Sequence, residues 1–96
     1  MKKINWSIKE NRILLEERDI SFEIVEEYIK NGHIVAVKNH PNQKNYPGQK
    51  IFILDILEYI YLVPFVENEE EIFLKTIIPS RKVTKESLWG KNENNT

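Results

Sequence analysis

Residues 51–78 read IFILDILEYIYLVPFVENEEEIFLKTII, and this stretch determines the fold that we expect. It contains three runs rich in branched and aromatic side chains, at residues 51–57, 59–66 and 72–78, which is the composition of β-strands. Short turns separate the runs, so consecutive strands are expected to pair as an antiparallel meander. Pro64 lies inside the second run, where it removes a backbone donor and predicts a bulge or an unpaired position.

Strand alternation in the last run predicts one face made by residues 72, 74, 76 and 78, and an opposite, partly wet face that contains Lys75 and Ile77. Upstream of the meander, residues 39–49 are polar and include two prolines and a glycine. This segment is long for a hairpin connection, and loops of this length often carry function. Another β-rich run at residues 33–38 precedes it, which brings the expected number of strands to four.

Two helices are expected before these strands. Ser7 and Glu10 have the spacing of a capping box, which predicts a helix that ends near residue 18. Its buried stripe is expected to contain Ile8, Leu14 and Leu15. Ser21 is the expected N-cap of a second helix, which ends at Asn31 and Gly32. The apolar stripe of this second helix is expected to contain Phe22, Val25 and Ile29.

After the last strand, Ser80 is the expected N-cap of a short C-terminal helix, and residues 90–96 form an almost purely polar tail that we expect to be disordered. The sequence therefore predicts an α+β fold in which two N-terminal helices pack on a four-stranded, mainly antiparallel sheet. Residues 1–89 are expected to form a single domain, because no repeat or inter-domain linker is visible.

The composition excludes several classes of protein. The chain has 96 residues, of which 41% are hydrophobic and 30% charged, as in one ordinary soluble domain. It has no cysteine, so disulfides, thiolate metal sites and cysteine nucleophiles are excluded, and two histidines alone argue against a zinc site. No apolar run approaches the roughly 20 residues of a membrane helix, and the first residues do not resemble a signal peptide. We therefore expect a cytoplasmic protein with no metal or cofactor.

The formal net charge of −1 hides strongly charged blocks. Residues 10–27 hold seven acids and two arginines, whereas residues 28–54 hold four lysines and no acid. Residues 55–71 hold six acids and no base, and residues 75–91 hold five bases and one acid. The two basic blocks would make one cationic face if the fold brings them together. The alternative is that all four blocks are solvated surfaces.

Four segments resemble the BrnT family of small bacterial toxins. They are residues 4–6 (INW) together with Lys9 and Asn11, 20–23 (ISFE), 40–41 (HP) and 75–84 (KTIIPSRKVT), and residues 77–81 are the most specific. The resemblance implies a RelE-like fold and a ribonuclease toxin of a type II toxin–antitoxin system. The chain departs from the family at residues 17–19, where Glu-Arg-Asp stands in place of the usual Lys-His-Gly. Residues 16–32 are also similar to a group of small domains of unknown function.

Metal-free RNA cleavage uses the neighbouring 2′-hydroxyl as nucleophile, so the protein must supply a base, an acid and cations for the phosphorane charge. Arg81 matches the signature arginine of the family and can hold a phosphate through two hydrogen bonds. His40 is a candidate for proton transfer and Lys75 for phosphate contact, which makes Arg81, His40 and Lys75 the predicted catalytic residues. The alternatives are an ion-paired arginine, an incidental loop histidine and a solvated lysine.

The predicted RNA-binding residues are cations and tyrosines of the basic blocks and the sheet. They are Lys82, Lys85, Tyr46, Lys44, Lys50 and Tyr61. For the tyrosines, the alternatives are an aromatic anchor of the long loop and ordinary cross-strand packing. Tyr59 and Tyr61 project together from the third strand, and either is a further candidate for proton transfer.

The resemblance implies a cognate antitoxin protein and messenger RNA as partners, with DNA contacted only through the antitoxin. No membrane partner is expected. A competing hypothesis is a non-catalytic protein-interaction module of the same fold, which the net charge and the acidic residues 17 and 19 favour. A third is RNA binding without cleavage, with an affinity that falls steeply as salt is added.

Overall fold

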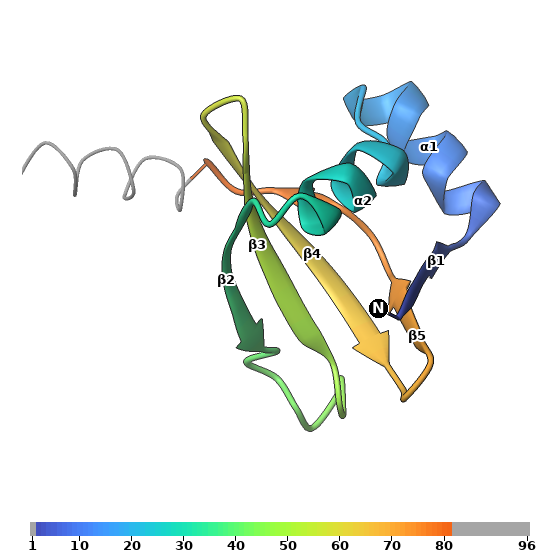
Figure 1. The fold of residues 1–96 in the computed structure, drawn as a ribbon, viewed down its shortest axis with the longest axis vertical. Helices are drawn as coiled ribbons and strands as arrows, with labels where there is room; N and C mark the ends of the chain where they lie inside the picture. The colour runs from blue at the N-terminus through green and yellow to red at the C-terminus, as the bar shows by residue number, and fades with distance from the viewer. Residues whose placement is uncertain (1, 82–96) are drawn as a thin grey trace, which may run out of the picture.

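The computed structural model of the protein describes residues 2–81, which form two layers: a pair of helices against one face of a mixed, mostly antiparallel sheet (Figure 1). The elements in chain order are β1 (Lys3–Trp6), α1 (Ile8–Arg18), α2 (Phe22–Lys30), β2 (Ile34–Asn39), β3 (Lys50–Ile56), β4 (Tyr59–Glu67), β5 (Glu71–Leu74) and β6 (Ile78–Pro79). The sheet order is β1-β5-β4-β3-β2, and β6 pairs with β4. The α+β class and the two N-terminal helices are confirmed.

The expected number of four strands is wrong, because the described sheet has six. The predicted antiparallel meander of β3, β4 and β5 is confirmed, and β2 also pairs with β3 in antiparallel fashion. Strand β1 adds a parallel strand next to β5, with Ile4 opposite Ile72. A four-residue strand whose partner lies more than 60 residues away has no local sequence signal. The predicted C-terminal helix and the polar tail lie outside the described residues, apart from the first two positions of the helix. None of the described helices is long and apolar enough to span a bilayer.

Helix α1 begins at its predicted cap, since the Ser7 hydroxyl accepts the N–H of Glu10 at 3.2 Å. The Glu10 carboxylate accepts a hydrogen bond from the Thr76 hydroxyl at 2.9 Å and so ties α1 to the chain after β5. The predicted buried stripe is largely wrong. Leu14 is buried, but Ile8 is 77% exposed and Leu15 is 47% exposed. The second inward position of α1 is polar, since it is held by Asn11.

Asn11 joins the two helices through a buried hydrogen-bond pair. Its side-chain oxygen accepts the N–H of Phe22 at 2.8 Å, and its amide nitrogen donates to the Glu23 carboxylate at 2.7 Å. The first N–H groups of a helix have no partner inside the helix, so Asn11 satisfies one donor at the start of α2. Ser21, the predicted N-cap of α2, accepts the N–H of Ile24.

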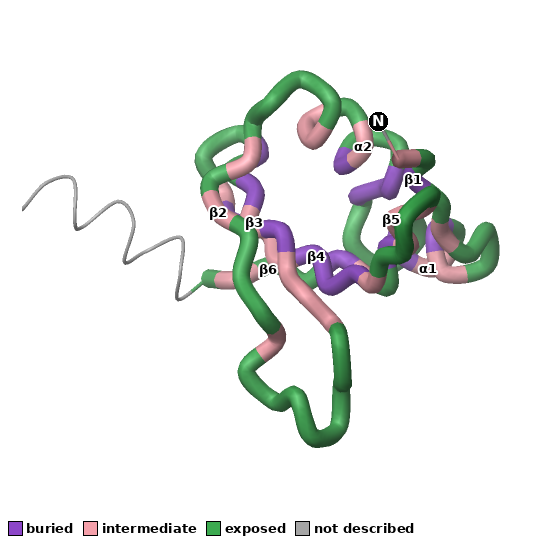
Figure 2. Tube along the Cα trace, turned by 60° about the horizontal axis from the view of Figure 1, so that its bottom comes forward, coloured by how far each residue is buried: buried purple, intermediate pink, exposed green. Residues whose placement is uncertain are grey.

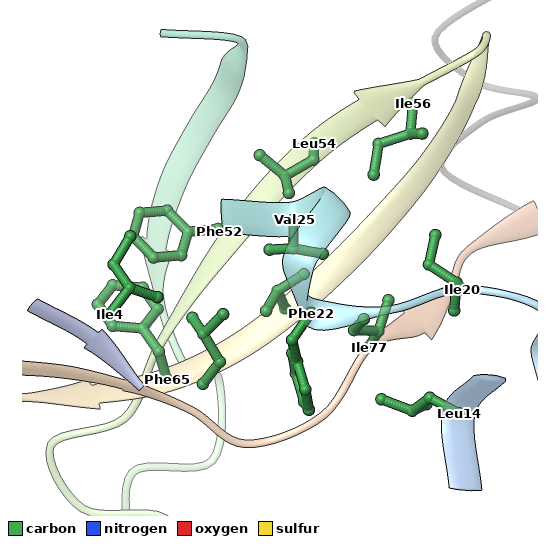
Figure 3. Close-up of a cluster of buried hydrophobic side chains, with 12 residues drawn as sticks. Ile4, Leu14, Ile20, Phe22, Val25, Phe52, Leu54, Ile56, Phe65 and Ile77 are labelled. Carbon is green, nitrogen blue, oxygen red and sulfur yellow. The ribbon is translucent and has the colours of Figure 1, made fainter. Parts of the chain in front are cut away.

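The core lies between the helices and the sheet, where the burial colours of Figure 2 concentrate along β3, β4 and the inner side of α2. Phe22 and Val25 of α2 pack toward Leu54 of β3, and Phe52 stacks on Phe65 with ring centroids 4.0 Å apart (Figure 3). Trp6 of β1 stacks on Phe22 at 5.6 Å, which anchors the N-terminal strand to the core.

Pro64 explains why β5 and β6 are separate strands. Its carbonyl accepts the N–H of Lys75 at 2.8 Å, but proline has no N–H to donate in return, so the ladder between β4 and β5 ends there. Pairing resumes with Ile78 opposite Leu62. The downstream chain therefore advances four residues, from Leu74 to Ile78, while β4 advances three, from Phe65 to Leu62. The predicted irregularity is confirmed. The predicted faces are wrong beyond it, because Ile77 is fully buried in the core and Ile78 points to the opposite side.

Candidate functional site

The sheet has one face that neither α1 nor α2 covers, which we call the bare face. Leu54 and Phe65 point toward the helices, so their alternate neighbours point away from them. The register places the apolar residues of the bare face side by side across the strands, because Ile51 faces Pro64, Ile53 faces Leu62, Val66 faces Phe73 and Leu62 faces Ile78. The bare face is therefore apolar at its centre.

Two lysines border the bare face. Lys38 of β2 lies opposite Ile51, and the backbone of Lys75 bonds to that of Pro64, so one row across the sheet runs from lysine over two apolar residues to lysine. The Lys75 ammonium lies 5.5 Å from the centre of the Phe73 ring, which holds this side chain over the sheet. Neither lysine has an ion-pair partner among residues 2–81. Lys38 was not among the predicted site residues. Its position in the β2 run is the sequence signal that indicates on which face of the sheet it lies.

The loop at residues 40–49 joins β2 to β3 and projects beyond the sheet as an exposed segment (Figures 1 and 2). It is held together by its own hydrogen bonds. The side-chain amide nitrogen of Gln43 donates to the carbonyls of His40 and Gln49, and the Gln43 oxygen accepts the N–H of Gly48. Gly48 has a φ of +75°, which glycine adopts without strain.

His40 and Tyr46 pack against each other within this loop, with ring centroids 4.4 Å apart. The N–H of Asn42 donates to Nδ1 of His40 at 3.0 Å, so Nδ1 carries no proton in this arrangement and Nε2 carries it. Tyr46 is 45% exposed and presents part of its ring to solvent. The pair is thus both an anchor of the loop and a surface on which a base can stack.

The other cations of this region differ in their surroundings. Lys44 is exposed on the loop, and no ion pair is found for it among residues 2–81. The Lys50 ammonium lies 3.5 Å from the Glu67 carboxylate, which Lys2 also contacts at 3.3 Å. One carboxylate is therefore shared by two ammonium groups, and the charge of Lys50 is only partly balanced. Lys82 and Lys85 lie outside the described residues.

Arg81 lies at the opposite end of the sheet from this loop. It follows β6, in which Pro79 pairs with Tyr61, and the N–H of Ser80 donates to the Ile60 carbonyl at 2.9 Å. The side chain of Arg81 is exposed and has no ion-pair partner within residues 2–81. Tyr61 packs partly against the core, and its ring centroid lies 5.4 Å from that of Tyr59.

The structure does not bring His40 and Arg81 together. At the end of β4 near the loop, Phe65 pairs with Lys50. At the end near Arg81, the Ile60 carbonyl accepts the N–H of Ser80. Five residues of strand separate Phe65 from Ile60, which corresponds to about 17 Å. His40 and Arg81 therefore cannot act on one phosphate without a large rearrangement. Continuing the pairing of β6 with β4 brings Arg81 level with Tyr59, with Tyr61 two residues further along β4, so both candidate tyrosines lie at the Arg81 end of the sheet.

Residues 17–19, where the sequence departs from the BrnT pattern, have a structural role. The Arg18 guanidinium donates to the Ile77 carbonyl at 2.6 Å and so holds the irregular chain between β5 and β6, four residues before Arg81. Asp19 is the C-cap of α1 and has a φ of +54° in the left-handed region. Glycine is favoured at such a position, which gives a physical reason for the glycine of the family pattern.

Within residues 2–81, no group of three or more histidine, aspartate or glutamate side chains is arranged to hold a metal ion. Comparisons with protein-family models, with curated proteins and with solved structures found no match to this chain. The resemblance to BrnT therefore stays a prediction that depends on the residues quoted for it.

Proposed function

We propose that the protein is the toxin of a toxin–antitoxin pair, a metal-independent endoribonuclease that cleaves messenger RNA and is neutralised by a cognate antitoxin protein. The observation that carries the proposal is the position of Arg81. This guanidinium is exposed, has no ion-pair partner within residues 2–81, and follows the strand that pairs with Tyr61. An exposed cation at the same end of β4 as two tyrosines, whose hydroxyls can donate or accept a proton, is a combination that metal-free RNA cleavage can use.

In this mechanism the 2′-hydroxyl of the RNA attacks the adjacent phosphorus, and the bond to the 5′-oxygen of the next nucleotide breaks. The products are a 2′,3′-cyclic phosphate and a 5′-hydroxyl, and no metal ion is needed. Arg81 stabilises the negative charge that builds up on the phosphorane oxygens. Tyr59 or Tyr61 takes part in proton transfer at the same phosphate, because both lie at the Arg81 end of β4 whereas His40 lies beyond its other end.

The remaining predicted residues hold the RNA away from the reacting phosphate. Lys75 pairs with Pro64, four residues of β4 or about 13 Å from Ile60 at the Arg81 end, so it contacts the RNA backbone from the border of the bare face and not the reacting phosphate. Lys82 and Lys85 continue the basic segment after Arg81. At the far end of the sheet, Lys44 contacts the backbone and the His40–Tyr46 pair stacks on a base. Lys50 contributes less, since Glu67, which it shares with Lys2, partly balances its charge.

The test is cleavage of a labelled RNA by the purified chain in the presence of EDTA. Wild-type protein is expected to produce cyclic-phosphate ends, and Arg81→Ala is expected to lower the cleavage rate by about 100-fold or more, as loss of a group that stabilises the transition state does. Lys9→Ala, which removes an exposed lysine of α1, is the matched control and keeps the wild-type rate. Replacement of the reactive 2′-hydroxyl by hydrogen abolishes cleavage at that site.

A second function, a protein-interaction module without catalysis, is favoured by the apolar centre of the bare face. Intact RNA after incubation with folded wild-type protein, together with normal growth of a bacterial host that expresses it, would contradict the ribonuclease proposal and support the module. RNA that binds tightly at low salt but stays intact would identify the third hypothesis, binding without cleavage.

A further inference from the structure

We propose that the bare face of the sheet is a docking surface for an amphipathic helix of a partner protein, whose apolar stripe is bordered on both sides by carboxylates. The inference does not depend on ribonuclease activity, because the surface is present whether or not the protein cleaves RNA. If both proposals hold, the helix covers Lys75 and so excludes RNA from this side of the sheet.

The apolar floor of the surface is broad enough for a helix. The exposed Asp55 lies on the same face near the turn between β3 and β4, beyond the apolar floor. The floor is formed by the outward residues of the two central strands and their neighbours, which are partly exposed apart from the buried Pro64. They are Ile51, Ile53, Leu62, Pro64, Val66, Phe73 and Ile78. Antiparallel sheets with one solvated face normally carry polar residues on it, so contiguous apolar residues here indicate a missing layer.

The two lysines define the shape and the charge of the occupant. Lys38 and Lys75 are separated by three strand spacings, or about 14 Å between backbones. An α-helix with its side chains is about 10–12 Å wide and fits between them when it lies over β3 and β4. Acidic side chains on both borders of the apolar stripe then reach one lysine each. Both lysines lack an ion-pair partner within residues 2–81, so pairing them disrupts no existing ion pair there.

Two other occupants fit the surface less well. A second copy of the chain packed face to face brings the lysines of both copies, four in all, to one interface, where like charges repel. Single-stranded RNA prefers aromatic platforms, and Phe73 is the one aromatic ring on the apolar floor defined above. Charge and shape together therefore favour the acidic amphipathic helix.

The probe for the experiment is a synthetic 18-residue peptide with leucines at helical spacing and glutamates on both sides of them, labelled with fluorescein. Its binding to the full chain is measured by fluorescence anisotropy. We expect Lys38→Glu and Lys75→Glu each to weaken binding by about tenfold, because each replaces an attraction with a repulsion. Lys9→Glu, the same change on α1, keeps the wild-type affinity. A peptide with lysines in place of the glutamates is expected to bind the double variant K38E/K75E better than it binds wild type.

Several results would overturn the inference. One is equal binding of a scrambled peptide with the same composition, and another is a loss of affinity in Lys9→Glu as large as in Lys75→Glu. A third is a dimer in light scattering that Leu62→Asn converts to monomer, which would identify a second copy as the occupant. A fourth is RNA that Lys38→Glu releases while the peptide stays bound.

The same variants separate this inference from the proposed function. Cleavage of RNA without specific peptide binding would contradict the docking surface alone. Specific peptide binding by a protein that leaves RNA intact would contradict the ribonuclease alone. Circular dichroism of each variant confirms that the surface substitutions leave the fold unchanged.

Discussion

Both faces of the sheet carry apolar side chains, but these are buried on one face and partly exposed on the other. On the helix side, Leu54 and Phe65 are almost fully buried beneath α2. On the bare face, their neighbours Ile53 and Leu62 are equally apolar but partly exposed, with lysines at the border. A sheet built for one solvated face alternates apolar with polar residues, whereas this one is apolar on both sides. The sheet is therefore suited to two covering layers, of which the described residues supply one.

The largest expected effect tests whether the two faces differ in energy. Phe65→Ala removes a ring that is 1% exposed and stacked on Phe52 at 4.0 Å, so we expect a loss of about 3–5 kcal/mol in the free energy of unfolding. Leu62→Ala on the bare face is expected to cost only about 1 kcal/mol, because part of this side chain is already in water. Urea denaturation of both variants measures the difference. Equal losses would show that the bare face is as closely packed as the core.

The next effect concerns the contact that keeps the helical layer together. Asn11→Ala leaves the Phe22 N–H without its partner in a buried position and removes the hydrogen bond to Glu23, so we expect a loss of about 2–3 kcal/mol in the free energy of unfolding. Arg12→Ala, at the adjacent exposed position of the same helix, is the matched control and is expected to cost less than about 0.5 kcal/mol. Urea denaturation again provides the measurement. Equal stability of the two variants would contradict a structural role for Asn11.

The sequence predicted the elements whose signals are local. Ser7 and Ser21 cap their helices as expected, and the meander of β3, β4 and β5 follows from composition and short turns. The sequence did not reveal β1, because its hydrogen-bonded partner is β5, which is distant in the chain. It also assigned Ile77 to the wrong face, since alternation continues only while the ladder is regular, and Pro64 interrupts it.

The candidate site was predictable as a set of residue types and not as an arrangement. Charge blocks identified the loop lysines and Arg81 as cationic, but only the register shows that the loop and Arg81 lie at opposite ends of β4. Lys38 was missed because a single lysine at the end of a β-rich run is common on edge strands. Its importance depends on Lys75 at the other border, which sequence spacing alone does not show.

The turn between β3 and β4 lies on neither face, so changing it alters stability without altering either layer. Leu57 and Glu58 form this two-residue turn, with φ values of +54° and +67° that are strained for non-glycine residues. Replacing them together by Asn and Gly, the residues that such turns favour, is expected to stabilise the protein by about 1–2 kcal/mol. Leu57 is 88% exposed, so little packing is lost. Thermal unfolding measures the gain, and a lower Tm in the double variant would contradict strain at this turn.

The smallest expected effect concerns Asp19, the C-cap of α1. The last residue of this helix, Arg18, holds the irregular chain between β5 and β6. Asp19 adopts a φ of +54° and places a carboxylate at the negative end of the dipole of α1. Asp19→Gly relieves both costs but makes the unfolded chain more flexible, so we expect a net gain of about 0.5 kcal/mol. Asp19→Asn removes only the charge and is expected to gain less.

Asp19→Ala separates the two causes, because it removes the charge but keeps a side chain that disfavours the left-handed conformation. If backbone strain dominates, the alanine variant is less stable than the glycine variant by about 1 kcal/mol, and its Tm is lower by several degrees. If the helix dipole dominates, alanine and asparagine have equal effects. The first result would mean that the left-handed conformation of Asp19 costs stability. This conformation ends α1 at Arg18, whose guanidinium donates to the Ile77 carbonyl and so fixes the chain that leads to Arg81.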